Sequence, residues 1–127
     1  MRWLLLALVG VVAGCGPDCL STCQRLHGDA TMPDGTEQCR ILRPGTGSAD
    51  MIRECVASCD RAMARAGTLD GYDPLVRTPP SEAQILENDR QAAAWMDCVN
   101  ATACEDLNDG YCAPTLNYSN DANASGG

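Results

Sequence analysis

Cysteine is the reactive residue that stands out in this sequence, with nine copies in 127 residues. Cysteines at this density could form disulfides, bind zinc or supply a catalytic thiolate. The chain has no Phe, two Trp and three Tyr, so it has little large apolar material for a core. Small exported domains of this kind commonly compensate with disulfides. We therefore expect four disulfides among the eight cysteines after Cys15, which are Cys19, Cys23, Cys39, Cys55, Cys59, Cys98, Cys104 and Cys112.

The same residues fit metal binding and catalysis less well. Two C-x₃-C pairs match zinc-ligand spacing loosely, with His27 as a further ligand near Cys23, but exported thiols are normally oxidised. A position at a helix end, where the dipole favours a positive charge, is the simpler interpretation of His27. A thiol oxidoreductase needs C-x-x-C at a helix start in a βαβ unit, and a cysteine hydrolase needs a suitably placed histidine base. We expect no catalytic residue, no metal and no cofactor.

Acidic residues dominate the charge of the chain. There are 17 Asp and Glu against nine Arg and no Lys, which gives a net charge of −8. Such a surface repels phosphate backbones, so we expect no nucleic-acid partner, and it also disfavours docking on anionic lipid through a basic patch. Many carboxylate pairs could serve glycoside hydrolysis, but nothing in the sequence selects one of them.

An acidic stretch between Cys104 and Cys112 is the main candidate for calcium binding. Its order from Asp106 to Gly110 resembles half of a calcium loop, but it skips a ligand position and lacks the distal Glu. Asn-Asp and Asp-Gly are also ordinary turn sequences. We therefore expect a tight acidic loop, with a weak calcium site as the alternative.

The N-terminus has the features of a targeting segment. Met1 and Arg2 form a short positive region, and the eleven residues from Trp3 to Ala13 are apolar. A membrane-spanning helix needs about 20 residues, whereas a signal peptide needs fewer. The run ends in Val12-Ala13-Gly14-Cys15, which resembles the lipobox of bacterial lipoproteins, although Val replaces the preferred Leu.

That resemblance implies cleavage between Gly14 and Cys15 and acylation of Cys15, which would hold the protein to a membrane through its acyl chains. Gly16 follows in place of the Asp that favours plasma-membrane retention in enteric bacteria, so the outer membrane is favoured over the inner membrane. The alternative is an ordinary secretory signal that is cleaved after Ala13 or Cys15. We expect a signal peptide at 1–14, a cysteine-rich domain at 15–113 and a disordered polar tail at 114–127.

Helical spacing predicts an all-α, disulfide-stapled domain of three helices. The first is expected at 17–27, with Gly28 as its stop, and the second at 48–66, capped by Ser48 or Asp50. Glycine and proline make 28–47 and 67–80 loops. The third helix is expected to open at a capping box, Ser81-Glu82-Ala83-Gln84, and to run to about position 100 or 103. Its apolar stripe includes Ile85, Leu86, Ala92, Trp95, Met96 and Val99.

The cysteine pairs at 19/23 and 55/59 each have i, i+4 spacing, which places both members on one helix face. This arrangement resembles the helical hairpins of small mitochondrial intermembrane-space chaperones, from which we take only the geometry. Sequential helices usually pack antiparallel, which favours Cys19–Cys59 and Cys23–Cys55. Parallel packing would instead give Cys19–Cys55 and Cys23–Cys59. For the remaining four we favour Cys104–Cys112 across the small loop and Cys39–Cys98.

These patterns favour a non-enzymatic, lipid-anchored protein of the cell envelope that acts by binding or as a structural component. The alternatives are a small periplasmic or secreted enzyme inhibitor or enzyme, and an exported toxin-like or signalling module. An apolar groove along the third helix would favour the binding role, and a deep pocket with convergent carboxylates would favour an enzyme.

Overall fold

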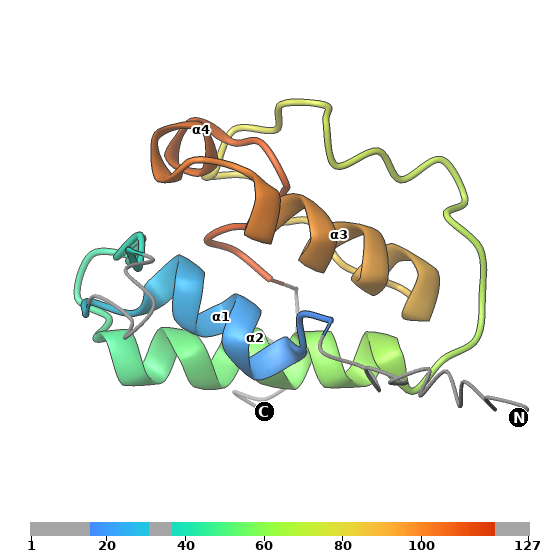
Figure 1. Ribbon diagram of the computed structural model, residues 1–127, viewed down its shortest axis with the longest axis horizontal. Helices are drawn as coiled ribbons and strands as arrows, with labels where there is room; N and C mark the ends of the chain where they lie inside the picture. Colours follow the sequence, from blue (N-terminus) through green and yellow to red (C-terminus); the bar gives the residue numbers. More distant parts are fainter. Residues whose placement is uncertain (1–15, 31–36, 119–127) are drawn as a thin grey trace, which may run out of the picture.

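The computed structural model describes residues 16–30 and 37–118 (Figure 1). Within these ranges the chain forms four helices, α1 (Cys19–His27), α2 (Ser48–Met63), α3 (Asp89–Ala101) and α4 (Cys104–Asp109), and no β-strand. The helices α1, α2 and α3 pack against one another. This confirms the small, disulfide-stapled all-α fold. The predicted signal peptide and Cys15 lie outside the described residues.

An antiparallel hairpin of α1 and α2 forms one side of the domain, along the bottom of Figure 1. α1 begins after Asp18, whose carboxylate accepts a hydrogen bond from the Ser21 backbone N–H at 2.7 Å. The disulfides Cys19–Cys59 and Cys23–Cys55 join the two helices, each with a Cα–Cα distance of 5.7 Å. This confirms the pairing expected from antiparallel packing of sequential helices and excludes the parallel alternative.

The predicted Cys39–Cys98 and Cys104–Cys112 pairs are wrong, because the structure contains Cys39–Cys104 and Cys98–Cys112. The expected acidic loop is instead the short helix α4, and it ends at Gly110, whose φ of 108° lets the chain turn back. After this turn Cys112 lies beside Cys98 of α3. Cys104, at the start of α4, is bonded to Cys39.

Arg25 explains how Cys39 reaches Cys104. Its guanidinium donates to the carbonyls of Val99 and Thr102, at the end of α3, at 3.1 and 2.7 Å. A third hydrogen bond, of 2.7 Å, joins it to the Glu37 carbonyl. The segment around Cys39 is therefore held beside the end of α3, where α4 begins.

The third helix starts at Asp89, and its cap residue, Asn88, lies seven residues after the predicted cap Ser81. Asn88 caps it by accepting hydrogen bonds from the backbone N–H groups of Arg90 and Gln91 at 3.0 and 3.1 Å. The residues of the predicted capping box pair with a distant segment instead. The Gln84 N–H donates to the Asn117 carbonyl at 3.3 Å, and the Asn117 amide donates to the Pro80 carbonyl at 2.9 Å. These contacts outweigh the local helix preference.

The helix predicted at 48–66 ends at Met63, and Ser48 does not cap it. Gly47 occupies the cap position, and the Ser48 hydroxyl donates instead to the His27 carbonyl at 2.6 Å. α2 is therefore tied at its start to the end of α1, in addition to the two disulfides further along.

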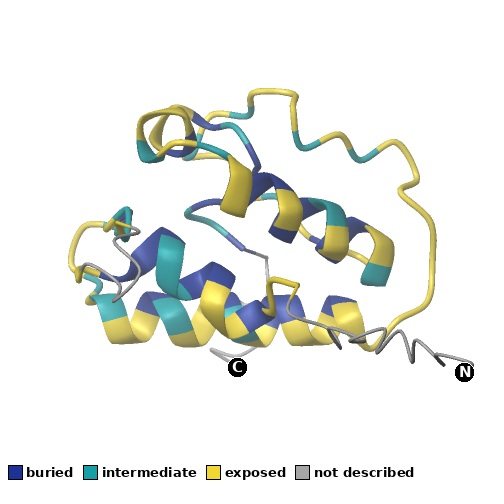
Figure 2. Cartoon of the chain, in the orientation of Figure 1, coloured by how far each residue is buried: buried dark blue, intermediate teal, exposed yellow. Residues whose placement is uncertain are grey.

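The core lies where α1, α2 and α3 face one another, and the outward faces of the helices are exposed (Figure 2). Trp95 of α3 is fully buried, as expected of a core residue, whereas Ile85, assigned to the same stripe, is 44% exposed. No helix in the described ranges is long and apolar enough to cross a membrane.

The C-terminal segment, defined here as residues 113–118, corrects the prediction of a disordered tail. Ala113, Pro114, Thr115 and Tyr118 are buried. This segment completes the core, which a chain without Phe fills in part with Tyr118. The rest of the predicted tail, 119–127, lies outside the described residues.

Candidate functional site

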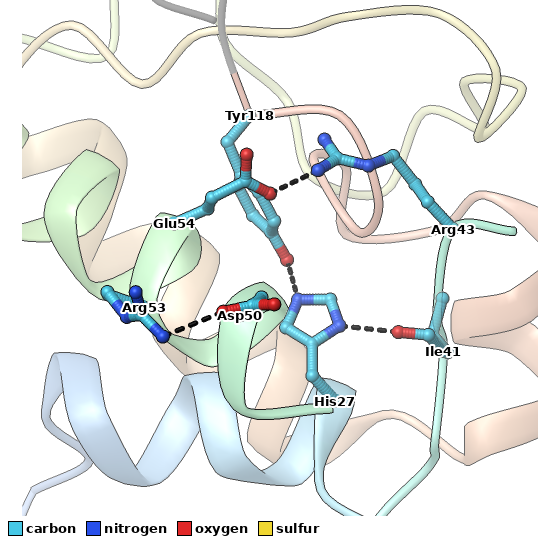
Figure 3. A network of polar contacts seen from close by, with 7 residues as sticks. All are labelled: His27, Ile41, Arg43, Asp50, Arg53, Glu54 and Tyr118. Carbon is cyan, nitrogen blue, oxygen red and sulfur yellow. Dashed lines mark hydrogen bonds and ion pairs between the residues drawn. The ribbon is translucent and has the colours of Figure 1, made fainter. Parts of the chain in front are cut away.

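A buried histidine at the end of α1 is the centre of a polar network in the core. The His27 side chain is fully buried, and both nitrogens of its ring have polar partners. Nδ1 lies 2.6 Å from the Ile41 carbonyl oxygen, and Nε2 contacts the Tyr118 hydroxyl (Figure 3). The His27 and Tyr118 rings meet edge to face, with centroids 5.4 Å apart.

The partners of His27 determine its protonation. A carbonyl oxygen can only accept, so Nδ1 carries the hydrogen and donates it to Ile41. Nε2 is then an acceptor, and the Tyr118 hydroxyl donates to it. Burial lowers the pKa of His27 from 6.5 to about 4, opposed by the hydrogen bond to Ile41 and assisted by the charge of Arg43. His27 is therefore neutral at pH 7, and the predicted favourable positive charge at a helix end is wrong.

Tyr118 is held in the complementary state. Burial raises the pKa of its hydroxyl well above 10, and the charge of Glu54 acts in the same direction. The hydroxyl therefore keeps its proton and remains a donor to His27. The Tyr118 ring also meets Trp95 edge to face, at a centroid distance of 6.4 Å.

Charged side chains of α2 and of the α1–α2 connection flank this network (Figure 3). Arg43 forms an ion pair with Glu54, and Arg53 forms one with Asp50 at 2.7 Å. Each carboxylate in the view thus has a cationic partner, and the two nitrogens of the His27 ring are hydrogen-bonded to Ile41 and Tyr118. The network therefore consists of the neutral, hydrogen-bonded His27 and Tyr118, with two partly exposed ion pairs beside them.

The C-terminal segment is held along its length by side chains from other parts of the fold. Tyr72 donates to the Ala113 carbonyl at 2.6 Å, and the Trp95 indole donates to the Pro114 carbonyl at 2.8 Å. The Ser58 hydroxyl lies 3.4 Å from the Tyr118 carbonyl. Tyr118 does not stand out in the sequence as a core residue, because its neighbours are polar. An aromatic residue in a chain with so few of them was the available indication that this stretch is buried.

This geometry argues against His27 as a catalytic base or a zinc ligand. Both ring nitrogens are occupied, no solvent reaches the ring, and Cys23 is part of a disulfide. Among residues 16–30 and 37–118, no three His, Cys, Asp or Glu side chains are grouped as metal ligands. His27 is instead a hydrogen-bonding core residue that joins α1, the segment at Ile41 and the C-terminal segment.

The acidic residues of α4 lie on its outer surface. Glu105, Asp106, Asn108 and Asp109 line an open hollow there, and Asp109 pairs with Arg77 at 3.2 Å. The weak calcium site stays a prediction for these residues. Since the hollow is open, it is not the deep carboxylate pocket that would favour a hydrolase.

Two further surface features could take part in binding. A hollow between α2 and the residues before α3 is lined by Ser58, Arg61, Ala62, Arg65, Ile85, Leu86 and Glu87. Separately, Leu75 and Val76 are 72% and 59% exposed in the connection between α2 and α3. Hydrogen bonds hold this turn in place, because the Leu75 N–H donates to the Asp73 carboxylate at 2.9 Å and the Cys112 N–H donates to the Pro74 carbonyl at 2.8 Å.

Comparison with known proteins assigns no family. No family model matches the chain, and no solved structure matches it. A stretch of 75 residues is 32% identical to part of a Bombyx mori protein described as "Putative ATP-dependent RNA helicase TDRD12". The match covers 59% of this chain but only 4% of that protein, so the helicase description stays with that protein.

Proposed function

We propose that this chain is an exported lipoprotein that is anchored through acyl chains on Cys15, in the outer membrane rather than the inner membrane. Its disulfide-stapled domain binds a partner or serves a structural role at the cell envelope. The observation that carries this proposal is the use of the cysteines. The four disulfides use the eight cysteines from Cys19 to Cys112, and Cys15 of the lipobox-like sequence is the one that they do not use. Disulfides of this density suit an oxidising compartment.

The short distance between the proposed anchor and the domain supports a defined orientation at a membrane. Cys15 precedes Cys19 by four residues, which span at most about 14 Å when extended. Cys19 is bonded to Cys59, near the end of α2. Acyl chains on Cys15 would therefore bring this end of the hairpin close to the bilayer. Leu20 and Met63, in the first turn of α1 and the last turn of α2, are exposed apolar residues of these two helix ends.

A binding or structural role is supported over hydrolysis by the chemistry of the described surface. The hollow beside α2 contains one carboxylate, Glu87, rather than the pair that glycoside hydrolysis needs. The hollows with more than one carboxylate, at Asp70 with Glu87 and along α4, are open rather than deep. The exposed pair Leu75 and Val76 stands on an ordered turn, which lowers the entropy lost on contact with a partner.

Metabolic labelling tests the anchor. Cells that express the full chain should incorporate a fatty-acid analogue into it, and the protein should partition into detergent. Cys15→Ser should abolish both, while the intact domain disulfides keep the protein folded and release it from the membrane. Unlabelled wild-type protein in the soluble fraction would overturn the lipoprotein assignment.

Crosslinking in intact membranes tests the binding surface. A photoreactive residue at Leu75 or Val76 should crosslink to a partner protein, and one at Thr46, on the separate α1–α2 connection, is the matched control. Leu75→Ser with Val76→Ser should weaken co-purification of that partner without changing acylation of Cys15. Equal crosslinking from all three positions would refute a specific surface at this turn.

A further inference from the structure

The C-terminal segment is the part of the buried core that no disulfide retains. It follows Cys112, the last cysteine of the chain, whereas α1, α2, α3 and α4 are all joined by the four disulfides. Its attachment therefore depends on packing and hydrogen bonds alone. A segment of this kind can leave while the cross-linked helices stay together.

The contact at the end of this segment depends on a neutral imidazole. Tyr118 donates to Nε2 of His27, which can accept only while that nitrogen is unprotonated. Protonation would place a positive charge in a site where the ring has no solvent contact. The Tyr118 hydroxyl could turn to accept from the new N–H, but this leaves the charge buried without a counter-ion.

Among residues 16–30 and 37–118, the carboxylates near His27 are already paired with arginines. Arg43, on the α1–α2 connection, repels protonated His27, and Glu54 of α2 is already paired with Arg43. Asp50 of α2 is paired with Arg53. From the C-terminal segment the facing titratable group is Tyr118 itself, and the neighbour of Tyr118 on α3 is the uncharged Trp95. Water is therefore the group that can stabilise the charge, and it reaches His27 only if a covering element moves.

We propose that the contact between His27 and Tyr118 is an acid-sensitive clasp: protonation of His27 releases the C-terminal segment and uncovers Trp95, while the disulfides hold the helices together. The element that moves is the one without a disulfide, because α1 and α2 are bonded to each other twice and Cys23–Cys55 lies one helical turn from His27.

The size of the response follows from the pKa of His27, about 4 in the closed form and near 6.5 once water reaches the ring. This difference in pKa changes the ratio of released to closed protein by up to about two orders of magnitude between pH 7.5 and pH values below 4. The closed form is favoured above pH 6.5, and release increases as the pH falls through this range. Acid favours release because the released form binds the proton on His27 more tightly than the closed form does.

Trp95 reports on release, because its indole N–H donates to the Pro114 carbonyl within the segment. The full chain with Trp3→Phe has Trp95 as its one tryptophan. As the pH falls from 7.5 to 3.5, its emission should shift to the red and amide exchange over 113–118 should increase, after correction for the intrinsic pH dependence. Far-UV circular dichroism should retain the helical signal. Loss of helix in step with the emission shift, or no shift at all, would overturn the proposal.

Three variants test whether the acid transition of Trp95 arises from the contact between His27 and Tyr118. His27→Gln removes the titrating ring and should abolish the acid transition, whereas Glu54→Gln, which breaks the neighbouring ion pair, should retain it. Tyr118→Phe removes the hydrogen bond that neutral His27 accepts, so the transition should move to higher pH. An unchanged midpoint in His27→Gln or in Tyr118→Phe, or loss of the transition in Glu54→Gln, would refute the clasp.

Nuclear magnetic resonance provides a measurement that does not depend on the folding of any variant. His27 is the one histidine of the chain, so its ring signals need no assignment by mutation. At pH 7 the ring nitrogens should show the Nδ1–H tautomer, and the titration of the ring should coincide with the Trp95 transition. A histidine that titrates while Trp95 and the amides of 113–118 do not respond would contradict release.

Discussion

The two disulfides between α1 and α2 close nested loops, so their contributions to stability should be interdependent. Cys19–Cys59 spans 40 residues and Cys23–Cys55 spans 32. Taken singly, each cross-link would stabilise the fold by nearly 4 kcal/mol, about 3.9 and about 3.7 kcal/mol, through the lost entropy of the unfolded chain. When one is present, however, the other closes only a ring of about eight residues, four along each helix.

Closing that small ring contributes about 2.5 kcal/mol. Removing either disulfide alone, as Cys19→Ala with Cys59→Ala or Cys23→Ala with Cys55→Ala, should therefore cost about 2.5 kcal/mol rather than about 4. Removing both should cost about 6 kcal/mol, which exceeds the two single effects together by about 1 kcal/mol. The packing lost with the sulfur atoms enters the single and combined variants alike, so it leaves this excess unchanged.

Urea unfolding followed by circular dichroism would measure the free energies, with the m-value fitted separately for each variant because cross-links make the unfolded chain more compact. Cys98–Cys112, which spans 14 residues and shares no ring with the hairpin pairs, is the control. Its removal should cost about 3 kcal/mol and add to the loss of Cys19–Cys59 within about 0.5 kcal/mol. Single costs near 4 kcal/mol that simply add up would refute the nested-loop reasoning.

Three further predictions concern titration and backbone conformation. With the C-terminal segment closed, the free energy of unfolding should fall by up to about 3 kcal/mol between pH 6.5 and pH 4, because the unfolded chain binds a proton on His27 near pH 6.5 and the closed protein only near pH 4. Urea unfolding at stepped pH measures this decrease, which should level off once the segment is released. A profile that is flat from pH 6.5 downwards would contradict it. The free energy of unfolding should also fall above pH 10, because burial raises the pKa of Tyr72 and Tyr118 in the folded protein. The folded protein then keeps protons that the unfolded chain releases. Phenolate absorbance of these two rings should therefore appear together with unfolding rather than before it. Gly110→Ala should destabilise the fold by more than about 1–2 kcal/mol, because φ is 108° and the new Cβ would lie 2.2 Å from a backbone oxygen. Gly71→Ala, with a φ of 81° and open space around it, should cost only the strain of a positive φ, about 1–2 kcal/mol. Equal urea midpoints for the two variants would be inconsistent with the close approach at Gly110.

The helical hairpin could be predicted because its determinants are local. An i, i+4 spacing places Cys19 with Cys23 and Cys55 with Cys59 on single helix faces whatever the rest of the chain does. Antiparallel packing of sequential helices then leaves one pairing, which is the one present. The all-α class and the burial of Trp95 follow from the same helical periodicity.

The remaining disulfides, the start of α3 and the His27 network depend on contacts between residues that are far apart in the chain. Cys39 meets Cys104 because Arg25 binds the end of α3, 74 and 77 residues away. The capping box at 81–84 does not open a helix because this segment pairs with Asn117. Tyr118 is buried because His27 accepts its hydrogen bond across 91 residues of sequence. Local preferences of a few tenths to about 1 kcal/mol cannot specify such partners, and burial with satisfied hydrogen bonds outweighs them once the chain is packed.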